Sequence, residues 1–159
     1  MNADFQTIVK ALWSGLKLAP PIFREAGSIV LQIDSQELKL SETPDGMNVQ
    51  ISGLAGRLAK DPGVQQRQVK MLLEQGLAQL VQDDTCVVLR ESSADVREIT
   101  VLSLHPCLTG ETEALMRRIE QVLARVEALA ARLETGTERA AQPMPRGGIL
   151  YGDEMILRP

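Results

Sequence analysis

The sequence offers few side chains that could carry out acid–base or nucleophilic chemistry. His105 is the single histidine among 159 residues and precedes Pro106, so any histidine-dependent triad or metal site would rest on it alone. The acidic pairs Asp83-Asp84 and Asp153-Glu154 fall in polar stretches where nothing would desolvate a carboxylate and raise its pKa. We therefore interpret His105 as structural or exposed and the acidic pairs as solvated charge, and we expect no enzymatic activity.

The two cysteines, Cys86 and Cys107, are too few and too far apart for a zinc knuckle or a redox CxxC motif. If Cys86 begins one strand of a hairpin that turns near Ser93, Cys107 lies well past its partner position and beyond disulfide reach. We predict two buried free thiols, no metal ligands and no cofactor.

Nucleic acid is not an expected partner, because the formal net charge is −4 and no long Lys/Arg cluster offsets it. The stretch Gly53-Leu54-Ala55-Gly56 has the GxxG form of an RNA-clamping loop, but its interior is apolar. Neither a GxGxxG fingerprint nor a Walker-type GK[ST] motif occurs, so the usual backbone devices for holding phosphate are missing from the sequence.

The chain length fits one domain, since 159 residues suffice for a single core. The N-terminal stretch contains Asp4 and Lys10 and lacks the pattern of an export signal. No apolar run approaches the roughly 20 residues needed to cross a bilayer. We expect a cytoplasmic protein without membrane insertion.

Hydrophobic periodicity predicts the first half of the domain. Residues 4–18 repeat apolar side chains at three- and four-residue spacing, which indicates an amphipathic helix that Pro20-Pro21 ends. From Ser28 the period changes to two, which predicts three short strands up to Ile51. The run Pro44-Asp45-Gly46 is typical of a turn and predicts a hairpin between the second and third strands.

The second half is predicted to begin after a loop around Gly53, Gly56 and Pro62. A helix follows over residues 64–82, and Gly76 on its apolar face indicates a close packing contact. Residues 85–90 and 98–105 then read as two strands with apolar side chains on both faces. A half-exposed sheet needs only one apolar face. The second apolar face should therefore be covered by a helix, by another subunit or by a bound chain, and we favour another subunit.

Residues 111–133 form the clearest predicted helix, in which apolar side chains alternate four- and three-residue steps. Two interpretations stay open: the helix packs on the sheet, or its heptad seam pairs with another protein as a coiled coil. From residue 135 the composition shifts to Thr, Gly, Ala, Gln and Pro, so we predict a domain over 1–134 and a flexible Pro/Gly-containing tail over 135–159. Two apolar clusters in the tail, Ile149-Leu150-Tyr151 and Met155-Ile156-Leu157, could dock as an extended peptide.

The order of these elements, α-β-β-β-α-β-β-α, resembles that of the class I type III secretion chaperones of the CesT/Tir-chaperone family. The more specific stretches of the resemblance are Ile29-Val30-Leu31-Gln32-Ile33-Asp34, the turn Asp45-Gly46, Leu54-Ala55-Gly56-Arg57-Leu58 and Leu72-Leu73-Glu74-Gln75-Gly76. Two positions depart from the family pattern: Gly76 stands where the family often has Asn, and Ala59 where it often has Pro. The resemblance covers about residues 5–133 and implies an α+β fold with a twisted antiparallel sheet packed by helices, in a homodimer.

The resemblance implies a non-enzymatic chaperone that binds the N-terminal segments of secreted effector proteins in extended form, keeps them soluble and helps deliver them to the secretion ATPase. It assigns the effector-binding groove to the first helix and the early strands, with the candidate residues Leu12, Leu16, Val30, Leu38 and Leu40. It assigns the dimer interface to the second helix and the strand after it, with the candidates Leu72, Leu73, Gly76, Leu77, Val87 and Leu89. Core packing explains the same apolar residues equally well.

The alternative hypothesis is an α+β regulatory or scaffold domain that associates through its C-terminal heptad helix. In that case Val122 and Val126 would lie on the functional surface, and Val122→Asp with Val126→Asp would abolish association and leave a folded monomer. A helix packed on the sheet would instead lose folding.

Overall fold

A computed structural model describes residues 3–24, 27–79, 84–93, 96–108 and 110–141. The element order is the predicted one, and all strand pairs are antiparallel within a five-stranded sheet of order β1-β2-β3-β5-β4. The predicted α+β class is therefore confirmed. The elements are α1 (Ala3–Gly15), β1 (Ser28–Ile33), β2 (Gln36–Glu42), β3 (Asn48–Arg57), α2 (Pro62–Gln79), β4 (Thr85–Ser93), β5 (Val96–Pro106) and α3 (Thr112–Ala141).

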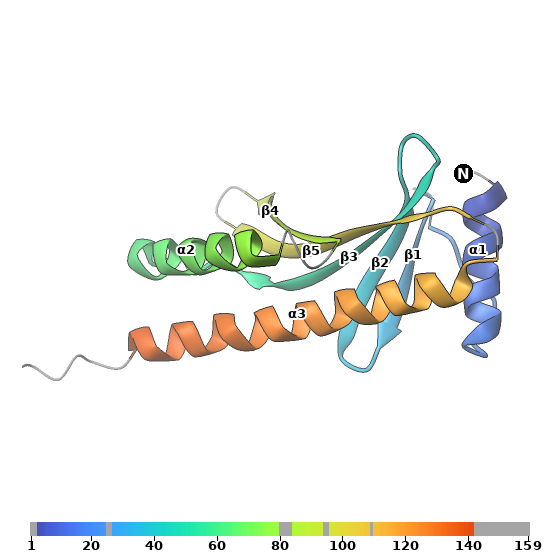
Figure 1. Cartoon of the computed structure of the whole chain (residues 1–159). Helices are drawn as coiled ribbons and strands as arrows, with labels where there is room; N and C mark the ends of the chain where they lie inside the picture. The colour runs from blue at the N-terminus through green and yellow to red at the C-terminus, as the bar shows by residue number, and fades with distance from the viewer. Residues whose placement is uncertain (1–2, 25–26, 80–83, 94–95, 109, 142–159) are drawn as a thin grey trace, which may run out of the picture.

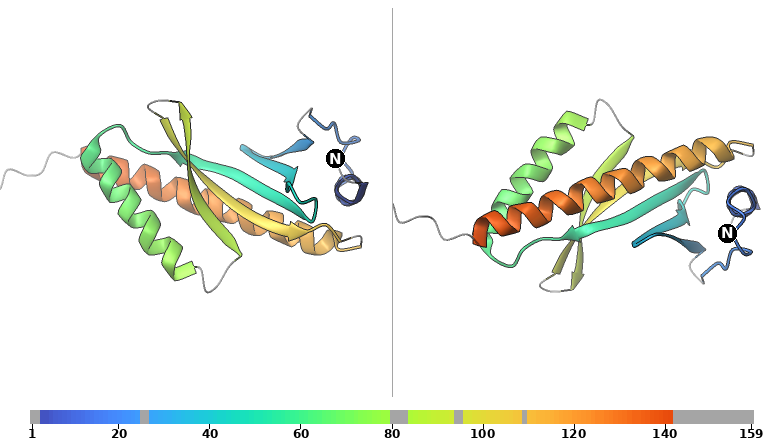
Figure 2. Two further views of the ribbon diagram at one scale, coloured as in Figure 1. Left: turned by 90° about the horizontal axis from the view of Figure 1, so that it is seen from above. Right: turned by 90° about the horizontal axis from the view of Figure 1, so that it is seen from below.

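The long helix α3 covers one face of the sheet, which we call the helix face, and runs along β3 and β5 (Figure 1). Because side chains alternate across a strand, Val49, Ile51 and Val101 point to this face, and each is fully buried. The opposite face, which we call the open face, carries Leu54 and Leu104. The view from above in Figure 2 shows that no helix among the described residues lies over it.

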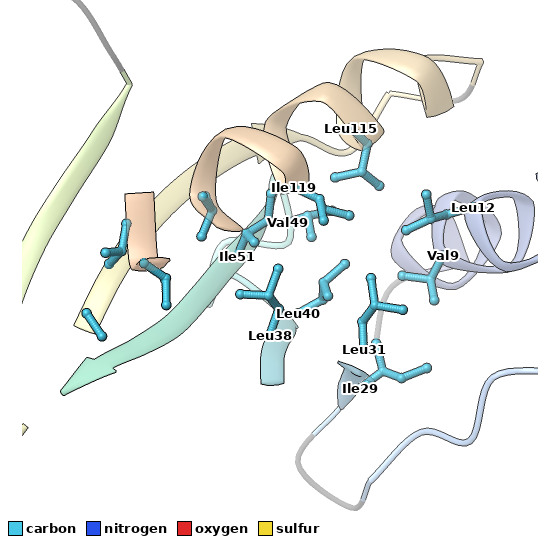
Figure 3. Packing of buried hydrophobic residues seen from close by; sticks show 14 of the residues in the cluster. Val9, Leu12, Ile29, Leu31, Leu38, Leu40, Val49, Ile51, Leu115 and Ile119 are labelled. Carbon is cyan, nitrogen blue, oxygen red and sulfur yellow. The ribbon is translucent and has the colours of Figure 1, made fainter. Parts of the chain in front are cut away.

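The core lies between α3 and the helix face and continues to α1 at the far end of the sheet. Figure 3 shows Val9 and Leu12 of α1 directed at Leu31 of β1, with Leu115 of α3 beside them. The burial of this continuous apolar layer is the main force that holds α1 against the sheet. The other labelled members of the layer are Ile29, Leu38, Leu40, Val49, Ile51 and Ile119.

Helix α1 ends at Gly15, three residues before the predicted end at residue 18. Lys17 adopts a positive φ of 55°. The amide of Leu18 donates to the carbonyl of Trp13 at 3.0 Å, and that of Lys17 donates to Ser14 at 3.1 Å, which is the Schellman arrangement. The local capping geometry therefore stops the helix before Pro20 can.

The predicted hairpin at Pro44-Asp45-Gly46 is confirmed. The amide of Gly46 donates to the carbonyl of Thr43 at 2.8 Å, and Gly46 has a φ of 71°, which suits glycine. The Asp45 carboxylate accepts hydrogen bonds from the Thr43 hydroxyl at 2.6 Å and the Met47 amide at 3.0 Å. These hydrogen bonds lower the pKa of Asp45, the Thr43 hydroxyl having the larger effect.

The predicted loop at Gly53 and Gly56 is wrong, because β3 continues through both residues to Arg57. Pairing with β5 extends the strand, and a bulge between Leu54 and Gly56 accommodates the shift in register. Gly53 faces α3 so closely that a Cβ atom there would lie 2.7 Å from Cγ2 of Val126. Glycine is needed at this position because the helix approaches the strand closely. From the sequence alone, such a glycine cannot be distinguished from one in a loop.

Helix α3 packs on the sheet, which settles its two interpretations. Val122 is fully buried and Val126 is 1% exposed, and both belong to the single core cluster. The apolar seam of α3 is therefore buried against the sheet of the same chain. It is not exposed for a coiled coil with another protein, which the alternative scaffold hypothesis required. The helix also continues to Ala141, so residues 135–141 extend α3 where a tail was predicted, and residues 142–159 lie outside the described part.

Candidate functional site

Strand β1 forms one edge of the sheet and presents backbone groups outward. In an antiparallel pair, alternate residues bond to the neighbouring strand. The Ser28 carbonyl accepts a hydrogen bond from the Arg24 amide at 2.8 Å, so Ser28 directs its backbone away from β2. By the same alternation, the backbone groups of Val30 and Gln32 point toward the open edge. A further strand could pair here.

Apolar side chains border this edge. Leu16 directly follows α1, is half-buried and packs against the core, while Val30 is half-buried on the open face. In the segment between α1 and β1, Leu18 is 46% exposed and Ile22 is 86% exposed. The apolar periodicity placed Leu18 at the end of the predicted helix and left Ile22 unassigned, so neither was named as a candidate contact. Exposed apolar residues on both sides of Pro20-Pro21 indicate a candidate binding surface.

The five candidate effector-binding residues divide into two groups. Leu16 and Val30 keep accessible surface, and Val30 lies on the β1 edge strand. Leu12, Leu38 and Leu40 are fully buried in the core, so a client could contact them only if α1 moved. Their assignment as client contacts stays a prediction. In this conformation they are core residues.

The candidate dimer residues lie on α2 and β4, at the other end of the sheet. Leu73 is 63% exposed and Leu89 is 45% exposed, whereas Val87 is half-buried and Leu72 is 7% exposed. A Cβ atom on Gly76 would meet nothing within 4 Å, so the close contact predicted there is not made by the residues that the structure describes. The side chain of Leu77 lies outside the described part. The dimer interface stays a prediction.

The residues considered for chemistry hold structural positions. His105 is 4% exposed on the helix face, and its Nε2 atom has no hydrogen-bond partner in the described part of the chain. Burial lowers the pKa of His105, the Glu111 carboxylate opposes that change, and the Arg118 guanidinium adds to it. Asp84 pairs with Arg118 at 2.7 Å, while Asp83 and the pair Asp153-Glu154 lie outside the described residues.

Both thiols are free, as predicted, but only Cys107 is partly buried; Cys86 is exposed, so its predicted burial is wrong. Cys86 pairs with Leu102 and points to the open face, which no described helix covers. Burial, with smaller effects of nearby carboxylates, raises the pKa of the Cys107 thiol. Within the described ranges, no group of three or more His, Cys, Asp or Glu side chains could hold a metal ion.

Among the described helices, none is long and apolar enough to cross a membrane. The sequence matches no protein-family model and no curated protein. Its fold is nevertheless shared with solved structures, which extend over about four fifths of the chain.

A chain of the HopA1–SchA chaperone–effector complex is 19% identical, with a TM-score of 0.64, and the match covers 80% of this chain and 94% of that one. The Yersinia pestis type III secretion chaperone SycH, solved with a fragment of YscM2, is 13% identical with a TM-score of 0.60, over 79% and 98% of the two chains. YbjN from E. coli, a candidate transcription regulator, is 14% identical with a TM-score of 0.53, over 82% and 90%. The chain therefore has the fold of type III secretion chaperones, and YbjN is similar to it as well.

Proposed function

We propose that this chain is a cytoplasmic chaperone of type III secretion, which binds the N-terminal segments of effector proteins in extended form, keeps them soluble and promotes their secretion. The observation that carries the proposal is the open β1 edge with its apolar border, on a fold that SchA and SycH share. An extended client would add a strand to β1 through main-chain hydrogen bonds.

The geometry at β1 fits such a client. Val30 and Gln32 offer their backbone groups, and half of the client side chains would alternate to the helix face, on which Val9 and Leu12 of α1 face Leu31 of β1 (Figure 3). Exposed Leu18 and Ile22 add apolar area close to the same edge. Main-chain pairing tolerates varied sequences, since every client offers the same backbone groups.

The direct test uses a proline on the edge. Val30→Pro removes the outward N–H of an edge strand, a position where proline is tolerated, and so should leave the fold intact while it weakens client binding. Val30→Ala is the matched control, because it keeps the N–H and also shortens the side chain. Binding of an N-terminal effector segment, measured by calorimetry, should fall at least tenfold in the proline variant relative to the alanine variant. Equal affinities of the two variants would remove strand addition from the proposal.

The broader role is tested by co-expression. An effector from the same host should co-purify with the chain and lose solubility and secretion when the chain is deleted. Delivery to the secretion ATPase belongs to the proposal through the family resemblance, and co-precipitation of the ATPase with the chaperone–effector complex examines it. If no effector co-purifies and effector solubility is unchanged by the deletion, the chaperone role is refuted.

We include in this proposal a homodimer formed through α2 and β4. Exposed Leu73 and Leu89, with the open space at Gly76, give two apolar elements side by side. Leu73→Asp with Leu89→Asp should convert a dimer into a monomer, measured by light scattering after size exclusion. Met47→Asp is the control, since Met47 is 70% exposed in the turn between β2 and β3, away from these elements. An unchanged mass in the double variant would refute this interface.

A further inference from the structure

The open face carries a contiguous apolar patch. On β5, Leu102 is half-buried and Leu104 is 45% exposed; on β3, Leu54 is 44% exposed. The register of β4 places Cys86 opposite Leu102 and Val88 opposite Thr100. These side chains share one face, because residues two apart along a strand and residues opposite each other across strands point the same way. We call this set, Leu54, Cys86, Val88, Leu102 and Leu104, the open-face patch.

The chain itself contains a segment that fits this patch. The matching solved structures are covered over 94% and 98% of their own length by about four fifths of this chain, so about one fifth of this chain exceeds what the shared fold requires. Residues 142–159 follow the end of α3 and contain the apolar triplets Ile149-Leu150-Tyr151 and Met155-Ile156-Leu157. Such triplets in a polar stretch are suited to an apolar surface.

The length of this segment and the place where it begins allow the contact. Leu133 of α3 lies against β3, since its Cδ1 atom is 3.0 Å from the Cβ position of Gly56. Ala141 lies roughly 12 Å farther along the helix, at 1.5 Å per residue. With a layer spacing of about 10 Å, Leu54 is then roughly 25 Å from Ala141. Ten extended residues span at most about 33 Å, which exceeds this straight-line distance and leaves length for a path around the end of the sheet.

The charges at the margin of the open-face patch are complementary to those of the C-terminal segment. Lys39, Arg57 and Arg90 point to the open face, as do Glu37 and Glu98. Arg57 pairs with Glu98 at 3.3 Å, which leaves Lys39 and Arg90 against the single carboxylate of Glu37. Asp153 and Glu154 stand between the two apolar triplets of the C-terminal segment. A segment seated on the patch would bring this acidic pair near a surface with an excess of positive charge.

We propose that residues 149–157 dock in cis on the open-face patch and shield it within the same protomer. The role is that of an intramolecular cover for an apolar sheet face, separate from the β1 edge. This inference does not depend on the chaperone role, and its failure would leave that proposal unchanged.

Cys86 provides a built-in reporter, because it is exposed on the patch in the described residues. In the full chain carrying Cys107→Ser, the docked segment should slow the reaction of Cys86 with a disulfide reagent such as DTNB. Leu150→Asp with Ile156→Asp should release the segment and raise the rate on the order of tenfold. The charge-matched control, Gln142→Asp with Gly147→Asp, adds two carboxylates outside the triplets and should keep the slow rate.

A change on the patch itself supplies the reciprocal test. Leu104→Asn should also raise the rate at Cys86, because it removes apolar surface from the docking site while the 45% exposed side chain contributes little to the core. The protection should be the same from about 1 to 100 μM protein. Equal rates in all variants would overturn the proposal, and protection that disappears on dilution would overturn docking in cis by assigning the cover to another copy.

Discussion

Gly53 is the position at which the packing of α3 on the sheet can be tested most sharply. A Cβ atom there would lie 2.6 Å from Cδ2 of Leu38 and 2.7 Å from Cγ2 of Val126, whereas carbon atoms prefer about 3.5–4.0 Å. Both neighbours are buried side chains in a close-packed layer and cannot move freely. Gly53→Ala should therefore strain the contact between β3 and α3.

The expected cost follows from this overlap. Overpacking by a methyl group costs about 1–3 kcal/mol, and the lower entropy of the unfolded alanine chain returns about 0.4–1 kcal/mol. We expect a net loss of about 1–2 kcal/mol in the free energy of unfolding. This corresponds to a decrease in Tm of roughly 3–8 °C for a domain of this size.

Urea denaturation followed by the fluorescence of Trp13 measures this loss, since Trp13 is the single tryptophan and is 6% exposed. Val126→Ala should relieve the part of the overlap that involves Val126 and leave the part that involves Leu38, so the double variant with Gly53→Ala should show a favourable coupling of at least about 0.5 kcal/mol. Gly15→Ala is the control: Gly15 is the last residue of α1 and its Cβ would meet nothing within 4 Å, so the substitution should stabilise the protein by up to about 1 kcal/mol. A Gly53→Ala protein as stable as the parent, or an additive double variant, would refute the packing argument.

Three further predictions concern titration and the buried seam. Burial lowers the pKa of His105 below its usual 6.5, so the unfolded chain binds the proton more readily than the folded protein does. The free energy of unfolding should therefore fall as the pH decreases from about 7 toward the pKa in the folded protein. His105→Gln should reduce this pH dependence, measured by urea denaturation at several pH values. Thr43→Val should raise the pKa of Asp45 toward 3.8, as measured by NMR titration of its carboxyl carbon, and an unchanged pKa would contradict the assigned hydrogen bond. Val122→Asp should abolish folding, seen as loss of the circular dichroism signal, because it buries an unpaired charge; a folded variant that only fails to associate would restore the scaffold hypothesis.

The sequence predicted the element order because the apolar periods of α1, the early strands and α3 are strong and local. It also predicted the hairpin at Pro44-Asp45-Gly46, where the residue types determine the turn. It failed at Gly53 and Gly56, because their place in β3 depends on pairing with β5, far along the chain. Such long-range pairing leaves no local signal.

The candidate site was less predictable for a related reason. Leu38 and Leu16 look alike as apolar residues in periodic segments, yet one is fully buried and the other keeps accessible surface. The difference depends on where α1 lies against β1, which the periodicity of neither element specifies. Cys86 is likewise exposed because no described helix lies over the open face. This depends on how the helices pack on the sheet, which the local sequence around Cys86 does not specify.

The position of α3 at the end of the folded unit has a consequence for synthesis. Translation adds about 5–20 residues per second, so roughly 1–5 s separate the completion of β5 at Pro106 from the addition of Leu133. Until then, the fully buried Val49, Ile51 and Val101 have no helix to cover them. Newly made chains therefore pass through an interval in which an apolar sheet is exposed, and slower codons within 107–133 should increase aggregation of the nascent protein.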